Sequence, residues 1–168
     1  MYLFYYVLFY NFILCNGFFR NMNCKIIQSS IVGFLPELKL HHVVVIQPSS
    51  MKKDVYAIDF SPIQYSLPTT LIKLLFAFDV PGETRVRFIK NGALFDENNF
   101  IDIWYKTNPT DSLESQQLTD TVVHSIHDKD IKKILYEVKK WNTNMNLYTH
   151  NCQHFSEFVK NKMLTQRR

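Results

Sequence analysis

The sequence predicts an α+β domain in which a small antiparallel sheet packs on helices, and three segments support this prediction. Residues 42–46 contain four consecutive β-branched side chains before a Pro-Ser-Ser turn, and residues 54–60 form a second, largely apolar run after it. Two such runs joined by a short turn are typical of an antiparallel hairpin. Residues 128–141 instead place apolar side chains at helical spacing, with lysines on the other side. Both patterns occur in a chain of 168 residues, the usual length of one domain.

Two further segments predict strands. Residues 25–27 are a short β-branched stretch, and residues 84–89 alternate between polar or charged and apolar side chains. Alternation of this kind predicts a half-buried strand with Arg85 and Arg87 turned toward solvent. A carboxylate- or phosphate-binding role for these arginines is the less favoured alternative.

Two further segments predict helices. One begins near Pro68 and is stopped by the Pro-Gly pair at residues 81–82, with an inner face made of Leu71, Leu74 and Leu75. The other begins at Cys152 and buries side chains four positions apart, namely Phe155, Val159 and Met163.

Composition and charge narrow the functional classes. Hydrophobic residues make up 46% of the chain and aromatic residues 15%, which excludes global disorder. The net charge of +4 comes from lysines and arginines spread along the chain, so no nucleic-acid partner is expected. Three cysteines are too few for a disulfide framework and leave the redox compartment undecided.

The first segment, residues 1–22, is interpreted as a leader separate from a single domain at residues 23–168. Residues 1–15 are almost wholly apolar, and Arg20 is the first charged side chain. The run is shorter than the roughly 20 residues of a membrane span but fits the apolar region of a signal peptide. A signal peptide or a membrane anchor through residues 1–19 would place the protein in the secretory pathway or at a membrane. The alternative is a core strand or docked helix in a cytoplasmic protein.

Cys152 is the candidate nucleophile. Asn151 is a good helix N-cap, so Cys152 would be the first helical residue, where unpaired N–H groups and the helix dipole favour thiolate over thiol. The same N–H groups can hold an oxyanion, and Asn151 and His150 are the side chains expected to shape that site. The alternative is that Cys152 is an inert, buried small residue.

The candidate base is His41 or His42. Adjacent strand residues point to opposite faces, so only one of them can address Cys152, and a strand beginning at position 42 favours His42. Asp59 in the second strand of the hairpin is the candidate that would orient the imidazole and stabilise its protonated form. A histidine exposed at the start of a strand and an aspartate opening a turn are the non-catalytic alternatives.

The residues around Cys152 allow two further roles. His154 lies about 200° around the helix from Cys152, so it is interpreted as a structural hydrogen-bonding residue and Phe155 as an anchor of the helix. The histidines on either side of Cys152 supply zinc-type donors, but a structural zinc site normally has paired ligands at regular spacing. Neither a metal nor another cofactor is therefore expected.

The run Asn151-Cys152-Gln153-His154-Phe155 resembles the Asn-Cys-Glu-His-Phe signature of lecithin:retinol acyltransferase-like proteins. These are circularly permuted papain-like thiol enzymes, related to the NlpC-type peptidases and the PPPDE-type isopeptidases, and their order of His before Cys is also the order here. The resemblance covers residues 38–165 by order of elements but about a dozen residues by motif. Gln153 replaces the family glutamate, Asp59 stands where a second histidine is usual, and the middle segment differs.

The resemblance implies a cysteine-dependent acyl hydrolase or acyltransferase with a permuted papain-like fold and a C-terminal nucleophile helix. Its substrate would be an acyl lipid or a peptide or isopeptide. Cell-wall peptides are the least expected substrate, because no wall-binding module is evident. The alternative function is an inactive papain-like interaction module tethered at a membrane, because a fold can persist without its chemistry.

Overall fold

The computed structural model describes residues 22–29, 41–48, 50–64, 67–91, 116–141 and 143–165. Its strands are β1 (Met22–Ser29), β2 (His41–Pro48), β3 (Val55–Pro62), β4 (Val80–Ile89), β5 (Gln116–Gln117) and β6 (Asn144–Met145). Its helices are α1 (Pro68–Leu75), α3 (Asp120–Ser125), α4 (Lys129–Val138) and α5 (Cys152–Thr165). The predicted α+β class is therefore confirmed.

The sheet is antiparallel, with its strands in the order β1-β2-β3-β4-β5, and β6 pairs with the start of β4. The predicted hairpin is confirmed, because β2 and β3 pair antiparallel from Val43↔Asp59 to Ile46↔Tyr56. This register places Asp59 on the same face of the sheet as Val43. Because the two strands are antiparallel, the start of β2 at His41 and the end of β3 at Pro62 lie at the same end of the sheet.

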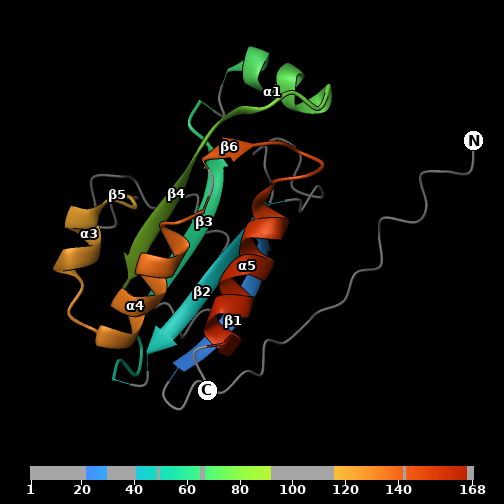
Figure 1. The fold of residues 1–168 in the computed structure, drawn as a ribbon. Coiled ribbons are helices and arrows are strands. Elements are labelled where there is room, and N and C mark those ends of the chain that lie inside the picture. The colour runs from blue at the N-terminus through green and yellow to red at the C-terminus, as the bar shows by residue number, and fades with distance from the viewer. Residues whose placement is uncertain are drawn as a thin grey trace, which may run out of the picture.

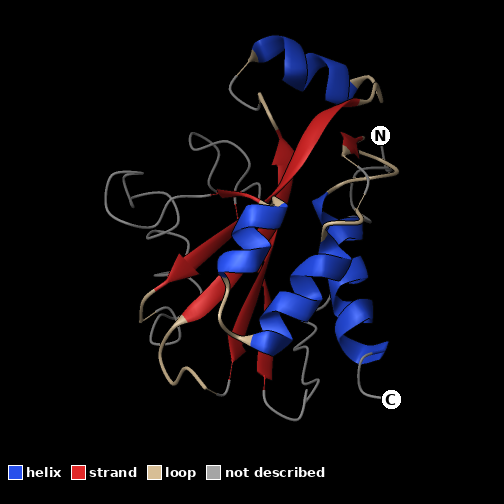
Figure 2. Ribbon diagram, turned by 60° about the vertical axis from the view of Figure 1, so that its left-hand side comes forward, coloured by secondary structure: helices blue, strands red, loops and turns tan. Residues whose placement is uncertain are grey.

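The two faces of the sheet carry different apolar clusters. The face that includes Val44, Ile46, Ile58 and Phe60 shares one cluster with the inner sides of α4 and α5. The opposite face carries a smaller cluster that includes Val43, Val45 and Ala57. In Figures 1 and 2, α4 and α5 lie side by side against one face of the sheet. The helix that begins with Cys152 is therefore packed directly on the strand that begins with His41.

Helices α4 and α5 match their predicted faces. In α4 the buried side chains are Ile131, Ile134, Leu135 and Val138, and in α5 the inward residues Phe155, Val159 and Met163 are buried as predicted. Asp128 caps α4 by accepting hydrogen bonds from the backbone N–H groups of Asp130 and Ile131.

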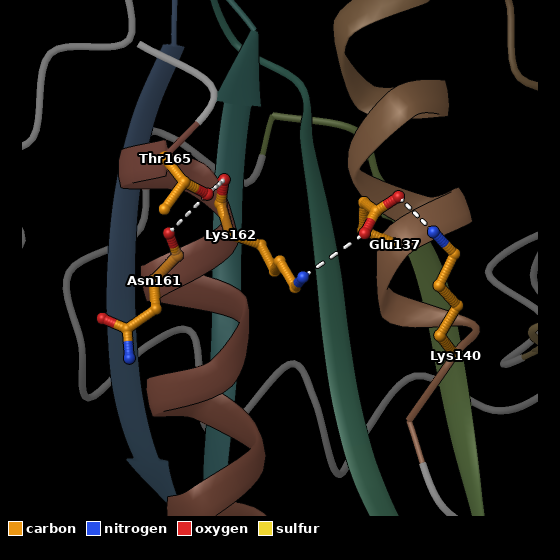
Figure 3. A network of polar contacts seen from close by, with 5 residues as sticks. All are labelled: Glu137, Lys140, Asn161, Lys162 and Thr165. Carbon is orange, nitrogen blue, oxygen red and sulfur yellow. Dashed lines mark hydrogen bonds and ion pairs between the residues drawn. The ribbon is translucent and has the colours of Figure 1, made fainter. Parts of the chain in front are cut away.

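A surface ion pair joins the two helices. The Nζ of Lys162 in α5 lies 3.4 Å from Oε2 of Glu137 in α4, and Oε1 of Glu137 binds Lys140 at 2.5 Å (Figure 3). The hydrogen bond from Lys140 is the main reason why the pKa of Glu137 lies below its ordinary value. Because this network is at the surface, its contribution to the free energy of folding is small, and apolar packing holds the helices together.

Two local predictions were wrong. Helix α1 ends at Leu75, before residues 81–82, which belong to β4. Leu75 is 63% exposed instead of packing inward, whereas Leu74 is buried. The side chain of Arg85 is 17% exposed, with its guanidinium bound to Glu83 at 2.5 Å, so it does not face open solvent. Arg85 pairs across the strands with the buried residue Asp59, which accounts for its low exposure, and Arg87 is likewise only partly exposed.

Residues 1–21 of the predicted leader lie outside the described residues. Residue 22, assigned to the leader from the sequence, instead begins β1, with its side chain only 3% exposed. In the part of the chain that the structure describes, no helix has the length and apolar character needed to cross a membrane.

We expect Gly82→Ala to destabilise the fold by about 1–3 kcal/mol, the usual cost of overpacking a core. A Cβ at position 82 would lie 2.8 Å from the ring of Phe60 and 3.1 Å from Cβ of Met145. Phe60 is fully buried, and buried side chains are close-packed. Urea denaturation would measure the loss. The double variant Phe60→Leu/Gly82→Ala should lose less than the sum of the single variants, and simple additivity would contradict this account.

Candidate active site

Cys152 is the first residue of α5 and is buried. Asn151 caps the helix as predicted, because its Oδ1 accepts hydrogen bonds from the backbone N–H groups of Gln153 at 2.9 Å and His154 at 3.1 Å. The Nδ2 of Asn151 donates to the carbonyl of Leu147 at 2.6 Å. The start of the helix is thereby held to the loop that precedes it, and this fixes the position of the thiol.

His41 is the histidine that contacts both Asp59 and Cys152. Its Nε2 lies 3.1 Å from Oδ2 of Asp59, and its side chain also hydrogen-bonds to Cys152. If Nε2 carries the proton shared with Asp59, Nδ1 is the ring nitrogen left to face the thiol. The three side chains come from the start of β2, from β3 and from the start of α5. A thiol, an imidazole and a carboxylate therefore lie in series.

The electrostatics of this group favour a protonated imidazole. Burial alone would lower the pKa of His41, but hydrogen bonds and negative charge from Asp59 and Cys152 outweigh it and raise the pKa to about 10. Asp59 is 3% exposed, and its Oδ1 has no hydrogen-bond partner among the described residues. A buried carboxylate of this kind needs a nearby cation, and the imidazolium of His41 provides one.

The histidine beside Asp59 is His41, and not His42, which the sequence favoured as the base. His42 does share a face with Val44 and Ile46, as expected, but Asp59 pairs with Val43 and therefore belongs to the opposite face. The choice depended on the register between β2 and β3, and neither segment encodes that register alone.

His42 instead connects β2 to the first turn of α5. Its Nδ1 lies 3.3 Å from Oγ of Ser156, and the hydroxyl of Ser156 donates to the carbonyl of Gln153. Because the Ser156 proton is already used, Nδ1 of His42 must be the donor in this pair. Its Nε2 then accepts from the Gln28 amide at 3.3 Å. Burial, and next the positive charge of His41, lower the pKa of His42, so the neutral form fits this network.

The loop before Cys152 is held by a backbone bridge and by aromatic stacking. Asn146 and His150 exchange two backbone hydrogen bonds, of 2.9 and 3.1 Å. The ring of His150 stacks on Trp141 at 4.1 Å and meets Phe60 edge-on at 5.8 Å. The ring of His150 therefore packs among aromatic residues, and the amide of Asn151 is used in capping. The oxyanion roles of His150 and Asn151 stay predictions, and backbone N–H groups are the better candidates.

His154 and Phe155 lie where the sequence placed them. Nδ1 of His154 lies 2.9 Å from Oδ1 of Asn151, so this exposed side chain supports the cap, and Phe155 is fully buried. Within the described segments, no three His, Cys, Asp or Glu side chains are grouped as ligands for a metal ion.

Comparisons with known proteins returned no match: neither a protein-family model, nor a curated protein, nor a solved structure is similar to this chain.

Two residues of the site were missed from the sequence, Ser156 and Gln28. Ser156 lies four positions after Cys152 on the same side of α5, so helical spacing is a signal that could have found it. Gln28 carries no comparable signal, because only the pairing of β1 with β2 brings it opposite His42.

Proposed function

We propose that the protein is a cysteine-dependent acyl hydrolase or acyltransferase in which Cys152 is the nucleophile, His41 the acid–base residue and Asp59 its orienter. The observation that carries the proposal is that His41 hydrogen-bonds to both other residues inside a buried site. A nucleophile beside a base that a third group orients is the general arrangement of covalent acyl transfer.

In the first half of the reaction, the proton of the Cys152 thiol resides on His41, and the thiolate attacks the carbonyl carbon of an acyl ester or amide. Backbone N–H groups at the start of α5, that of Cys152 among them, stabilise the negative charge that develops on the carbonyl oxygen. The bond to the leaving group then breaks, and His41 gives its proton to the departing alkoxide or amine. The product is an acyl thioester on Cys152.

In the second half, neutral His41 takes a proton from water or from an acceptor hydroxyl or amine. The oxygen or nitrogen attacks the thioester carbonyl, the C–S bond breaks, and the thiolate of Cys152 is restored beside the imidazolium. Water gives hydrolysis and another acceptor gives transfer. Asp59 keeps the imidazole in place and stabilises its positive charge throughout. No cofactor takes part in these steps.

A circularly permuted papain-like fold is part of the same proposal. Three features support it: the histidine strand precedes the cysteine helix in the chain, the helix packs on the antiparallel sheet, and the third polar residue comes from the neighbouring strand. Acyl lipids and peptide or isopeptide bonds are the two substrate classes that this chemistry accommodates.

The specific observation favouring an inactive binding module is the burial of Cys152, which is 3% exposed. A nucleophile must meet its substrate, so catalysis requires an approach to the sulfur that a purely structural cysteine does not need.

The test of the proposal is the rate at which iodoacetamide alkylates Cys152 at pH 6 and at pH 9, with Cys15 and Cys24 replaced by serine. A thiol with an ordinary pKa of about 8.5 reacts roughly 200-fold more slowly at pH 6, because little thiolate is present. We expect the rate at Cys152 to fall by less than about 10-fold, because the imidazolium of His41 supports the thiolate.

His41→Gln and His42→Gln are the matched pair for this test. The first should restore the steep pH dependence of an ordinary thiol, and the second should keep the shallow one. A steep dependence in the parent protein, or the same result for both variants, would favour the binding module.

A further inference from the structure

The large hydrophobic side chains that the described residues expose gather at one end of the fold. Nine are exposed in all, and seven of them belong to α1, its flanking segments and the loop before Cys152. We call these seven the α1 surface: Ile63, Leu67, Ile72, Leu75, Phe76, Phe78 and Tyr148. Phe76 is 72% exposed and Phe78 is 61% exposed. Apolar side chains exposed together in this way mark an interaction site.

Hydrogen bonds attach the α1 surface to the loop that leads to Cys152. The hydroxyl of Tyr148 donates to the carbonyl of Leu75 at 3.1 Å, and Nδ2 of Asn146 donates to the carbonyl of Ala77 at 2.8 Å. Oδ1 of Asn146 accepts from the backbone N–H of Tyr148. Cys152 comes four residues after Tyr148 in the chain. The α1 surface is therefore attached to the loop that leads directly to the candidate nucleophile.

The shape and charge of the α1 surface suit a lipid bilayer. Figures 1 and 2 show α1 projecting from the end of the sheet at which β3 ends and β4 begins. A projecting element can enter a bilayer, whereas a peptide partner is usually held in a groove. Lys73 is the only charged residue at positions 61–78, and Asp79 at the margin accepts a hydrogen bond from Asn146. The net charge of +4 is spread along the chain, so it favours approach to anionic lipids over long range without a basic cluster at the α1 surface.

We propose that the α1 surface docks on an anionic lipid bilayer. Phe76, Phe78 and Tyr148 would lie at the level of the lipid headgroups, where aromatic side chains are favoured. This docking is independent of the proposed function.

The experiment is sedimentation of the full chain with vesicles of phosphatidylcholine containing phosphatidylserine. Leu75→Ser/Phe76→Ser/Phe78→Ser should weaken partitioning by at least about 10-fold, because three apolar side chains no longer enter the bilayer. The matched control is Tyr136→Ser/Leu164→Ser, which removes the two large hydrophobics that the described residues expose outside the α1 surface. This control should bind like the parent protein, as should Cys152→Ala, which separates docking from catalysis.

The fluorescence of an introduced tryptophan tests whether the α1 surface itself, and not another part of the chain, enters the bilayer. The fluorescence that Phe78→Trp adds to that of the native Trp104 and Trp141 should be quenched by brominated lipids, while the fluorescence that Tyr136→Trp adds should not be. The proposal is overturned if the triple variant binds as well as the parent or if both tryptophans respond alike. It is also overturned if the triple variant loses self-association instead, since the surface would then join two copies of the chain.

Discussion

Cys152→Ala is expected to abolish covalent acyl transfer. With p-nitrophenyl acetate, the parent protein should release an initial burst of p-nitrophenolate equal to the amount of protein. One acetyl group should then be found on Cys152 by mass spectrometry. Because an acyl thioester cannot form without the sulfur, the variant should show no burst. Its rate should fall by roughly 10⁴-fold or more, as it does when the nucleophile of a serine protease is removed.

The matched control for this variant is Cys24→Ala. Cys24 lies in β1 and pairs with Ile46, toward the end of β2 that is remote from His41. Its removal should leave both the burst and the acetylated peptide unchanged. An unaltered burst in Cys152→Ala would refute the proposed nucleophile, whatever its effect on stability.

Asp59→Asn is expected to lower the free energy of unfolding by about 3–5 kcal/mol near pH 6, the usual cost of removing one partner of a buried ion pair. The introduced amide would keep the shape of the side chain but lose the charge that opposes the burial of the imidazolium. In the variant, burial would therefore dominate, and the pKa of His41 would fall. Urea denaturation of both proteins between pH 6 and pH 10 measures the difference.

The pH dependence of this loss of stability follows from the direction in which folding shifts the pKa of His41. The pKa of His41 rises from 6.5 to about 10 on folding, so the folded chain holds a proton that the unfolded chain releases. The stabilisation is complete below pH 6.5 and disappears as the pH rises toward 10. The gap between the parent protein and Asp59→Asn should therefore be widest near pH 6 and close by about pH 10.

Asp54→Asn is the control for this prediction. Asp54 precedes the same strand, and its Oδ1 accepts a hydrogen bond from the backbone N–H of Asn91. It lies at the other end of β3 from the histidines, so its loss should change stability by a similar amount at every pH in this range. Parallel curves for the parent protein and Asp59→Asn would contradict the ion pair between Asp59 and His41.

The features that the sequence predicted correctly are those that short segments encode. The hairpin of β2 and β3 follows from two apolar runs around a turn, and the faces of α4 and α5 follow from helical spacing. The cap at Asn151 is also local, because the side chain of a cap binds N–H groups two and three residues later. The start of the helix that carries Cys152 could therefore be placed from about five residues.

Helix α1 shows why other features could not be predicted. Its leucines have the spacing of an amphipathic helix, yet Leu74 is buried and Leu75 is exposed. Spacing predicts which side chains share a face, but whether another element covers that face depends on the rest of the fold. The exposure that marks the α1 surface as an interaction site is thus a property of the tertiary structure.

By itself, the sequence determined the α+β class, the helix start at Cys152 and the set of side chains that were candidates to contact Cys152. Each of these depends on residues close together in the chain. Only the tertiary structure showed that His41, and not His42, lies beside Asp59. Strand alternation assigns the two histidines to opposite faces, but the register of β2 against β3 determines which face carries Asp59. That register is set by the packing of the whole sheet, so residues far apart in sequence make the choice.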